Sequence, residues 1–348
     1  MKFLPQEDSF FGLDIGSSSI KLTQLRQLHG QPNLVTYGDI EIPENLFASS
    51  SEIDQAKMAG LISQLAQDAK VSSKNVVASL NAAQSYTAII QTPKLTHEEL
   101  AESIKFQADK VIPMAIDQVK LDWAVVGEDV ESEELDILLV AAPNIVANKY
   151  LEIVQKAGFE LLALEINSIA QARSLIRPTD RSKCILLVDV GMQATDFAIV
   201  EDMVPHLVRS ASVGSKAFAR SIIQNLSIDE EQADQFMHKF GMDNTKIEGQ
   251  VYKTLKPIVD QLVDELNKSI NFFQEKNDNL KIEKIILTGG TSALPGLALY
   301  IANNTGLTVE IGNAWQNISY PAELEANLAG LSLSYGTAIG LSLRGFKL

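Results

Sequence analysis

Two short segments of the chain place an aspartate, and two positions later a glycine, at the end of an apolar run. The segments are residues 10–21 and 186–196, and their aspartates and glycines are Asp14 with Gly16 and Asp189 with Gly191. Hydroxyl residues and a second apolar run follow each glycine. Each pattern predicts a strand, a tight turn and a returning strand, in which backbone N–H groups and hydroxyls face an anion. Two such turns facing each other would clamp a polyphosphate.

A third segment, residues 285–296, reads as a buried strand that runs through Gly289 and Gly290 into the start of a helix. Glycines there let a flat base or a ribose lie against the backbone, and Pro295 suits an early helical position. One Asp-x-Gly turn alone is weak, because hairpins of many proteins use these residues. The three segments together, in this order, resemble the phosphate-1, phosphate-2 and adenosine motifs of the actin-like ATPase superfamily, which predicts a nucleotide cleft.

Length and charge bound the kind of protein. A chain of 348 residues exceeds the size at which one core keeps growing, so two lobes are expected. The formal net charge of −15 argues against a nucleic-acid groove and against adsorption on an anionic membrane surface. Proteins and a magnesium-bound nucleotide are therefore the expected partners.

Cysteine, histidine and hydropathy patterns exclude several further classes. The single cysteine, Cys184, rules out an internal disulfide and a cysteine-based metal site, and the four histidines have no ligand spacing. The N-terminus lacks the pattern of a signal peptide, and no run approaches the ~18 apolar residues that a membrane span needs. We expect a cytoplasmic protein.

Hydrophobic periodicity divides the chain into five parts. Strands over 20–25, 33–42 and 76–80 and a helix over 51–70 predict a first-lobe core over 1–84. An inserted subdomain follows over 85–159, with strands over 86–91, 120–126 and 136–141 and helices over 96–111 and 145–157. Thr96 and Glu99 form a capping box at the first of these helices.

The second half of the chain is also predicted to contain both strands and helices. A connecting helix over 161–176, within a connecting segment 160–183, is expected to lead into a second lobe over 184–327. That lobe contains a strand over 206–212 and helices over 215–225, 227–240 and 247–277, the second opened by Ser227 and Glu230. A C-terminal helix within 328–348 is expected to return to the first lobe, with Gly336 and Gly340 on its close-packed face.

With these features in place, the chain resembles the PilM family of type IV pilus assembly, actin-like relatives of the cell-division protein FtsA. The most specific residues are 12–21, Thr92 to Pro113 in the insertion, Asp122 with Trp123, and 339–345. The resemblance covers essentially the whole chain. It implies an α/β, actin-like ATPase fold with two lobes around a nucleotide cleft and an FtsA-type insertion in the first lobe.

The resemblance also implies roles for individual residues in binding ATP and Mg²⁺. Asp14 and Asp189 would hold Mg²⁺ largely through water, because this small cation keeps its hydration shell. The β-phosphate would be lined by Gly16, Ser17, Ser18 and Ser19, the γ-phosphate by Gly191 and Thr195, and the adenosine by Gly289, Gly290 and Ser292. Lys21 shares strand parity with Ser19, so its ammonium group can point into the cleft, although an exposed strand-end lysine is the alternative.

Two departures from the family pattern bear on the base and ribose. The usual paired glycine in the second lobe is replaced by Gly214 followed by Ser215, and the usual Glu and Lys of a ribose-contacting helix by Asp234 and Met237. Weaker nucleotide binding or relaxed base preference follows. Neither Gln193 nor Glu165 can be given the role of orienting an attacking water, so we expect ATP binding with at most slow hydrolysis.

The family implies an adapter that docks on the cytoplasmic tail of a PilN-like inner-membrane protein and couples it to the pilus motor ATPases. The last residues, Gly345 to Leu348, add no amphipathic segment, so we expect the protein to reach the membrane through this partner and not by direct insertion. Two alternatives stay open: a filament-forming actin-like protein and an ATP-dependent small-molecule kinase of the same fold.

Overall fold

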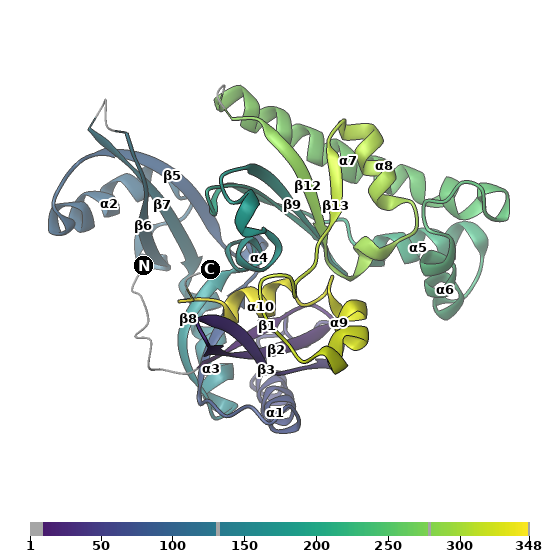
Figure 1. Cartoon of the computed structure of the whole chain (residues 1–348), viewed down its shortest axis with the longest axis horizontal. Helices are drawn as coiled ribbons and strands as arrows, with labels where there is room; N and C mark the ends of the chain where they lie inside the picture. The colour runs from purple at the N-terminus through teal and green to yellow at the C-terminus, as the bar shows by residue number, and fades with distance from the viewer. Residues whose placement is uncertain (1–9, 130–132, 278–279, 347–348) are drawn as a thin grey trace.

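The computed structural model describes residues 10–129, 133–277 and 280–346. Two sheets of five strands each form the two lobes, and a three-stranded sheet forms a separate layer beside the first lobe (Figure 1). The order β3-β2-β1-β4-β8 of the first sheet is matched by β11-β10-β9-β12-β13 in the second. The two lobes therefore repeat one topology, as the two similar turns suggested. Lys347 and Leu348, the chain end on which the expectation of no anchor rested, lie outside the described residues.

The first lobe confirms the predicted order of strands and helix. An antiparallel meander is followed by a crossover to a parallel strand, and α1 and α3 lie on one face of the sheet. Ser51 caps α1 by accepting a hydrogen bond from the backbone N–H of Asp54. The elements are β1 (Phe10–Ile15), β2 (Ser19–Leu28), β3 (Gln31–Glu41), α1 (Glu52–Asp68), β4 (Asn75–Leu80), α3 (Asn144–Lys156) and β8 (Glu160–Ile166).

The insertion is a three-stranded antiparallel sheet in the order β5-β7-β6, with one helix on a face of its own. The predicted capping box of Thr96 and Glu99 is present at α2. Ile137 and Leu139 face α2, whereas Leu138 packs into the first-lobe core together with α3. We therefore propose that the inserted subdomain ends near residue 143, before α3. Its elements are β5 (Tyr86–Pro93), α2 (His97–Val111), β6 (Val119–Asp129) and β7 (Glu134–Pro143).

The connecting helix predicted over 161–176 is wrong in its first half. Residues 160–166 form β8, which pairs in parallel with β4, and the helix α4 (Asn167–Leu175) begins only afterwards. Leucine, alanine and glutamate favour a helix by intrinsic propensity, but the free edge of β4 offers this segment a full set of backbone partners. Sheet pairing overrides local propensity here.

The second lobe confirms the predicted hairpin and the buried strand beside it. Strands β9, β10 and β11 are antiparallel neighbours, and β12 pairs in parallel with β9. The elements are β9 (Cys184–Val190), β10 (Thr195–Glu201), β11 (Val204–Ala211), α5 (Ser215–Leu226), α6 (Glu230–Phe240), α7 (Gln250–Lys276), β12 (Ile282–Thr288), α8 (Leu297–Thr305) and β13 (Thr308–Ile311).

Two helix starts in this lobe differ from prediction. Asp229, not Ser227, caps α6 by accepting from the backbone N–H of Gln232, because Ser227 takes a left-handed conformation that ends α5. After β12 a short 3₁₀ turn over Gly290–Ala293 intervenes, so Pro295 precedes α8, which begins after the left-handed Gly296. The predicted capping box and the early-helix proline are therefore both wrong in detail.

The C-terminal segment forms two helices and not the single one that was predicted: α9 (Glu325–Leu331) and α10 (Gly336–Ser342). Helix α10 returns to the first lobe, where the N–H of Gly12 donates to the Ser342 hydroxyl at 2.9 Å. A side chain on Gly340 would overlap the carbonyl of Ala170 in α4, so the close approach predicted for this glycine is confirmed. Helices α4 and α10 thus cross tightly between the two sheets (Figure 1).

None of the helices in the described part of the chain is long and apolar enough to cross a bilayer.

Candidate functional site

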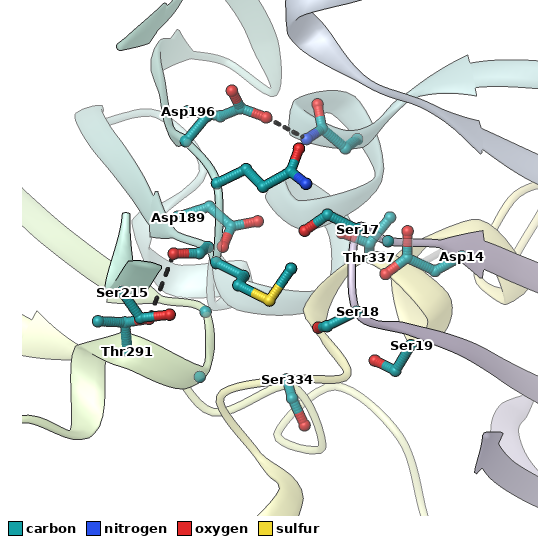
Figure 2. Close-up of a pocket in the computed structure, with 18 of the residues that line it drawn as sticks. Asp14, Ser17, Ser18, Ser19, Asp189, Asp196, Ser215, Thr291, Ser334 and Thr337 are labelled. Carbon is teal, nitrogen blue, oxygen red and sulfur yellow. Dashed lines mark hydrogen bonds between the residues drawn. The ribbon is translucent and has the colours of Figure 1, made fainter. Parts of the chain in front are cut away.

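The two Asp-x-Gly turns face each other across a cavity of about 580 Å³ between the lobes. Figure 2 shows Asp14 and the three serines of the first turn, Ser17 to Ser19, on one wall and Asp189 on the other. The structure brings most of the predicted residues together. Those that line the cavity are Asp14, Gly16, Ser17, Ser18, Ser19, Lys21, Asp189, Gly191, Asp234, Gly289 and Gly290.

Both turns are closed by the same backbone hydrogen bond. The N–H of Gly16 donates to the carbonyl of Ser19, and the N–H of Gly191 donates to that of Ala194, each at 3.0 Å. A Cβ atom at Gly16 or Gly191 would lie 3.0 or 2.9 Å from the carbonyl oxygen of its turn. The N–H groups inside the turns, those of Ser17, Ser18, Met192 and Gln193, have no hydrogen-bond partner among the described residues. They remain available to an anion.

Asp14 stands at the end of β1, directly opposite Lys21 on β2. The Ser79 hydroxyl donates to its carboxylate at 2.7 Å. Burial raises the pKa of Asp14, and the nearby Lys21 ammonium and the Ser79 hydroxyl partly offset that rise. Lys21 lines the cavity, and its ammonium group donates to the Ser19 hydroxyl at 2.5 Å.

Asp189 stands at the matching position of β9, and its cross-strand neighbour is Asp196. Burial, and secondly the charge of Asp196, raise the pKa of Asp189 to about 7. Its carboxylate accepts a hydrogen bond from the side-chain amide of Gln171 at 2.5 Å, and Asp196 accepts one from Asn167 at 2.8 Å. Two carboxylates thus share the second turn, each held by an amide from α4.

Three predicted residues do not line the cavity. Thr195 is fully buried, and its hydroxyl donates to the carbonyl of Val213 at 2.6 Å. Ser292 is buried as well, and its hydroxyl donates to the carbonyl of Thr288. Gly214 lies behind the second turn, where a Cβ atom would be 2.5 Å from the carbonyl of Met192. All three support the walls of the site from behind.

Gly289 and Gly290, the double glycine after β12, line the cavity next to Asp189. Gly289 has a φ of 86°, and a Cβ atom there would lie 2.3 Å from a carboxylate oxygen of Asp189. Farther along the cavity, Met237 is buried in the second-lobe core while Asp234 and His238 are exposed on α6. The hydroxyl of Ser215, which replaces a glycine of the family pattern, lines the same wall (Figure 2).

Sequence reasoning missed several lining residues. Asn167 and Gln171 occupy the first turns of α4, and no local motif marks them. Asp196 could have been predicted from the repeated motif. It lies opposite Asp189 on β10, just as Lys21 lies opposite Asp14 on β2. Other lining residues that were not predicted are Ser79, Thr291, Ser334 and Thr337. Of the two residues left without a role, Gln193 lines the cavity, whereas Glu165 lies elsewhere in a buried ion pair with Arg173 and Arg344.

Comparisons with known proteins agree with this arrangement. A family model described as "Type IV pilus assembly protein PilM" matches residues 12–346. Cell division protein FtsA of Enterococcus faecalis (strain ATCC 700802 / V583) is 18% identical over 368 residues, covering 90% of this chain and 84% of that protein.

Solved structures show the same fold. The chain superposes on a PilM-PilN type IV pilus biogenesis complex with a TM-score of 0.83 and 24% identity, over 99% of this chain and 100% of that one. MreB5 of Spiroplasma citri bound to ADP gives a TM-score of 0.52 at 13% identity, over 97% and 95%. The fold is therefore the actin-like ATPase fold, and the chain belongs to the PilM family of type IV pilus assembly proteins.

Proposed function

We propose that this protein is an ATP-binding, actin-like adapter of type IV pilus assembly. It lies in the cytoplasm, docks on the cytoplasmic tail of a PilN-like inner-membrane protein, and couples that protein to the motor ATPases. The observation that carries the proposal is the pair of matched turns facing one cavity in a chain of the PilM family. The solved PilM-PilN complex supports the choice of partner.

The nucleotide is held through its phosphates. The free N–H groups of Ser17 and Ser18 approach from one lobe and those of Met192 and Gln193 from the other, and the Lys21 ammonium group lies beside the first turn, where it donates to the Ser19 hydroxyl. Anions bind such clusters of N–H groups because the donors are fixed before the ligand arrives. The ribose and base extend over Gly289 and Gly290 toward α6.

Mg²⁺ fits the two strand-end aspartates. Both carboxylates are hard oxygen donors, and burial raises the pKa of both, so a divalent cation would favour their ionised forms. One oxygen of Asp14 is held by Ser79, and one of Asp189 by Gln171. The described residues contain no cluster of three or more acidic, histidine or cysteine side chains, which suits an ion held mainly through water and phosphate. Bound there, Mg²⁺ would neutralise phosphate charge.

Hydrolysis is at most slow in this proposal. The amide of Gln171 already donates to Asp189 and to the Thr337 hydroxyl, so it is held in place by the site itself. Gln193 lines the cavity without a hydrogen bond to a base among the described residues. Such a site binds and orients the phosphates, but neither of these two glutamines is placed to activate the attacking water.

The docking surface is the outer edge of β6 in the insertion. In the order β5-β7-β6, strand β5 faces β11 of the second lobe, whereas β6 has no strand beyond it among the described residues. Val125 of β6 is 50% exposed. An extended apolar peptide can add to such an edge through main-chain hydrogen bonds.

A binding assay tests this surface. A fluorescent peptide with the N-terminal cytoplasmic sequence of the PilN-like partner should bind the wild-type protein. Val125→Asp should weaken binding at least about tenfold, because it places a charge where β6 exposes an apolar side chain. Leu299→Asp, at a position of α8 in the second lobe that is 66% exposed, is the matched control and should leave the affinity unchanged. Equal affinities for wild type and Val125→Asp would remove β6 from the proposal.

A further inference from the structure

The mouth of the nucleotide cleft opens into a second cavity, of about 560 Å³, between the lobes. Ser18, Met192 and Ser215 line both cavities, so the second adjoins the phosphate turns. First-lobe residues on its wall include Glu44, in the loop after β3, and second-lobe residues include Lys216, at the start of α5. Glu44 and Lys216 therefore lie on the wall of the cavity that adjoins the phosphate turns.

Glu44 and Lys216 form an ion pair that joins the two lobes. The hydrogen bond from Lys216, and then its charge, lower the pKa of Glu44. The pair is partly open to solvent, with 56% of the Glu44 side chain and 33% of the Lys216 side chain exposed. Its strength therefore depends on how firmly each partner is held.

Backbone hydrogen bonds tie each partner to a phosphate turn. On the first lobe, the N–H of Ile42 donates to the carbonyl of Ser18 at 2.9 Å, two residues before Glu44. On the second lobe, the N–H of Lys216 itself donates to the carbonyl of Met192 at 3.0 Å. The distance between the two charged groups therefore follows the distance between the two phosphate turns.

The loop that carries Glu44 is also held from behind. The Phe47 carbonyl accepts a hydrogen bond from the Lys149 ammonium, which lies 4.8 Å from the centre of the Phe47 ring. That ring packs edge-on against Tyr150 at 5.0 Å between centroids. Both neighbours belong to α3, which packs in the first-lobe core, so Glu44 starts from a supported position.

We propose that the Glu44–Lys216 pair is a latch across the mouth of the cleft, which slows release of the nucleotide. The inference rests on the proposed function and adds a means of regulating it. When the turns close on phosphate, the pair is held together, and the lobes must separate it before the nucleotide departs. Because the pair is solvent-exposed, it changes the release rate by a modest factor that salt reduces.

Release of a methylanthraniloyl-labelled ATP, chased with unlabelled ATP in the presence of Mg²⁺, tests the latch. Glu44→Gln should release the probe about twofold to fivefold faster, a factor typical of an exposed pair. Removing a negative charge would by simple electrostatics slow the loss of an anionic ligand, so faster release identifies the latch. Glu231→Gln, an exposed acid on the same cavity without an ion-pair partner in the described structure, is the matched control.

Exchanging the charges provides the decisive variant. Glu44→Lys combined with Lys216→Glu should restore the wild-type release rate, whereas each substitution alone accelerates release. High salt should accelerate release from wild type but not from Glu44→Gln. Wild-type release rates in the single variants, or no rescue by the exchange, would overturn the latch.

A second measurement does not depend on nucleotide. Spin labels at Ser63→Cys in α1 and Gln224→Cys in α5, both exposed positions, report the separation of the lobes, since Cys184 is buried. Glu44→Gln should lengthen or broaden the distance distribution, and the charge exchange should restore it. If the protein bound no ATP, the proposed function would fail, and an unchanged distribution would independently reject the latch.

Discussion

The two phosphate turns have the same backbone and opposite charge patterns. In the first lobe, the residue opposite the strand-end aspartate Asp14 is Lys21, and in the second lobe the residue opposite Asp189 is Asp196. The first turn therefore carries its own counterion. The second turn places two carboxylates side by side, and the pKa of Asp189 rises to about 7.

Because of this difference, we expect the two lobes to contribute unequally to phosphate binding. On the proposed function, the first turn attracts phosphate by itself, because Lys21 offsets the charge of the buried carboxylate and the N–H groups of the turn have no partner among the described residues. The second turn is repulsive to phosphate until a proton or a cation compensates its carboxylates. We infer that Mg²⁺ matters more to the second turn than to the first.

The largest expected effect would come from breaking the shared backbone. Gly16→Val and Gly191→Val each place a branched side chain within about 3 Å of a turn carbonyl, and each should weaken ATP binding about a hundredfold. Gly60→Val, in α1 with open space around it, should bind like wild type. A loss in only one turn would mean that the phosphates rest on one lobe.

The next effect isolates the counterion of the first turn. Lys21→Met removes the cation opposite Asp14, so the pKa of Asp14 should rise further and ATP affinity should fall about tenfold. Lys21→Arg keeps the charge and should retain most of the affinity. Titrations of both variants with Mg²⁺-ATP near neutral pH measure the difference, and affinities equal to that of wild type would show that Lys21 takes no part in binding the nucleotide.

Burial of Asp189, and secondly the charge of Asp196 beside it, should make stability depend on pH. The folded chain holds a proton on Asp189 up to a pKa of about 7, which the unfolded chain releases at its ordinary, lower pKa. The free energy of unfolding, measured without Mg²⁺ and nucleotide, should therefore fall by about 2–4 kcal/mol as the pH rises from the ordinary aspartate pKa to about 7. Asp196→Asn removes the like charge and should reduce this slope in part, because Asp189 stays buried. Urea unfolding at several pH values measures it, and parallel slopes would contradict the pairing.

The smallest expected effect concerns the base. Asp234 is largely exposed, and its carboxylate lies 3.4 Å from His238 one helical turn later. Asp234→Ala should change ATP affinity by only about twofold, and the native protein should discriminate only modestly between ATP and GTP. Competition between the two nucleotides measures this, and a hundredfold preference would show that other residues of the cavity read the base.

Local signals accounted for much of the fold. The capping box at Thr96, the Asp-x-Gly hairpins and the close contact at Gly340 depend on neighbours in sequence or on steric limits of glycine, and the structure confirms them. The segment over 160–166 could not be predicted in this way, because its strand exists only through pairing with β4. Its leucine and glutamate residues favour a helix when no partner strand is considered.

In the site, too, some features could be predicted from local sequence and others depend on the fold. Glycines at the turns were predictable, since backbone geometry demands them. The directions of hydroxyls were not: Thr195 and Ser292 belong to the right motifs but donate to buried carbonyls. Gln171 contributes because the fold sets α4 beside the end of β9, which no sequence spacing reveals.

Calorimetric titration with ATP, with and without Mg²⁺, tests the central claim that both lobes hold one Mg²⁺-ATP. Wild type should bind one ATP per chain and bind it more tightly with Mg²⁺. Asp14→Asn and Asp189→Asn should each weaken Mg²⁺-ATP at least about tenfold, with most of the Mg²⁺ dependence lost in Asp189→Asn. Unchanged affinity in both variants would contradict the account.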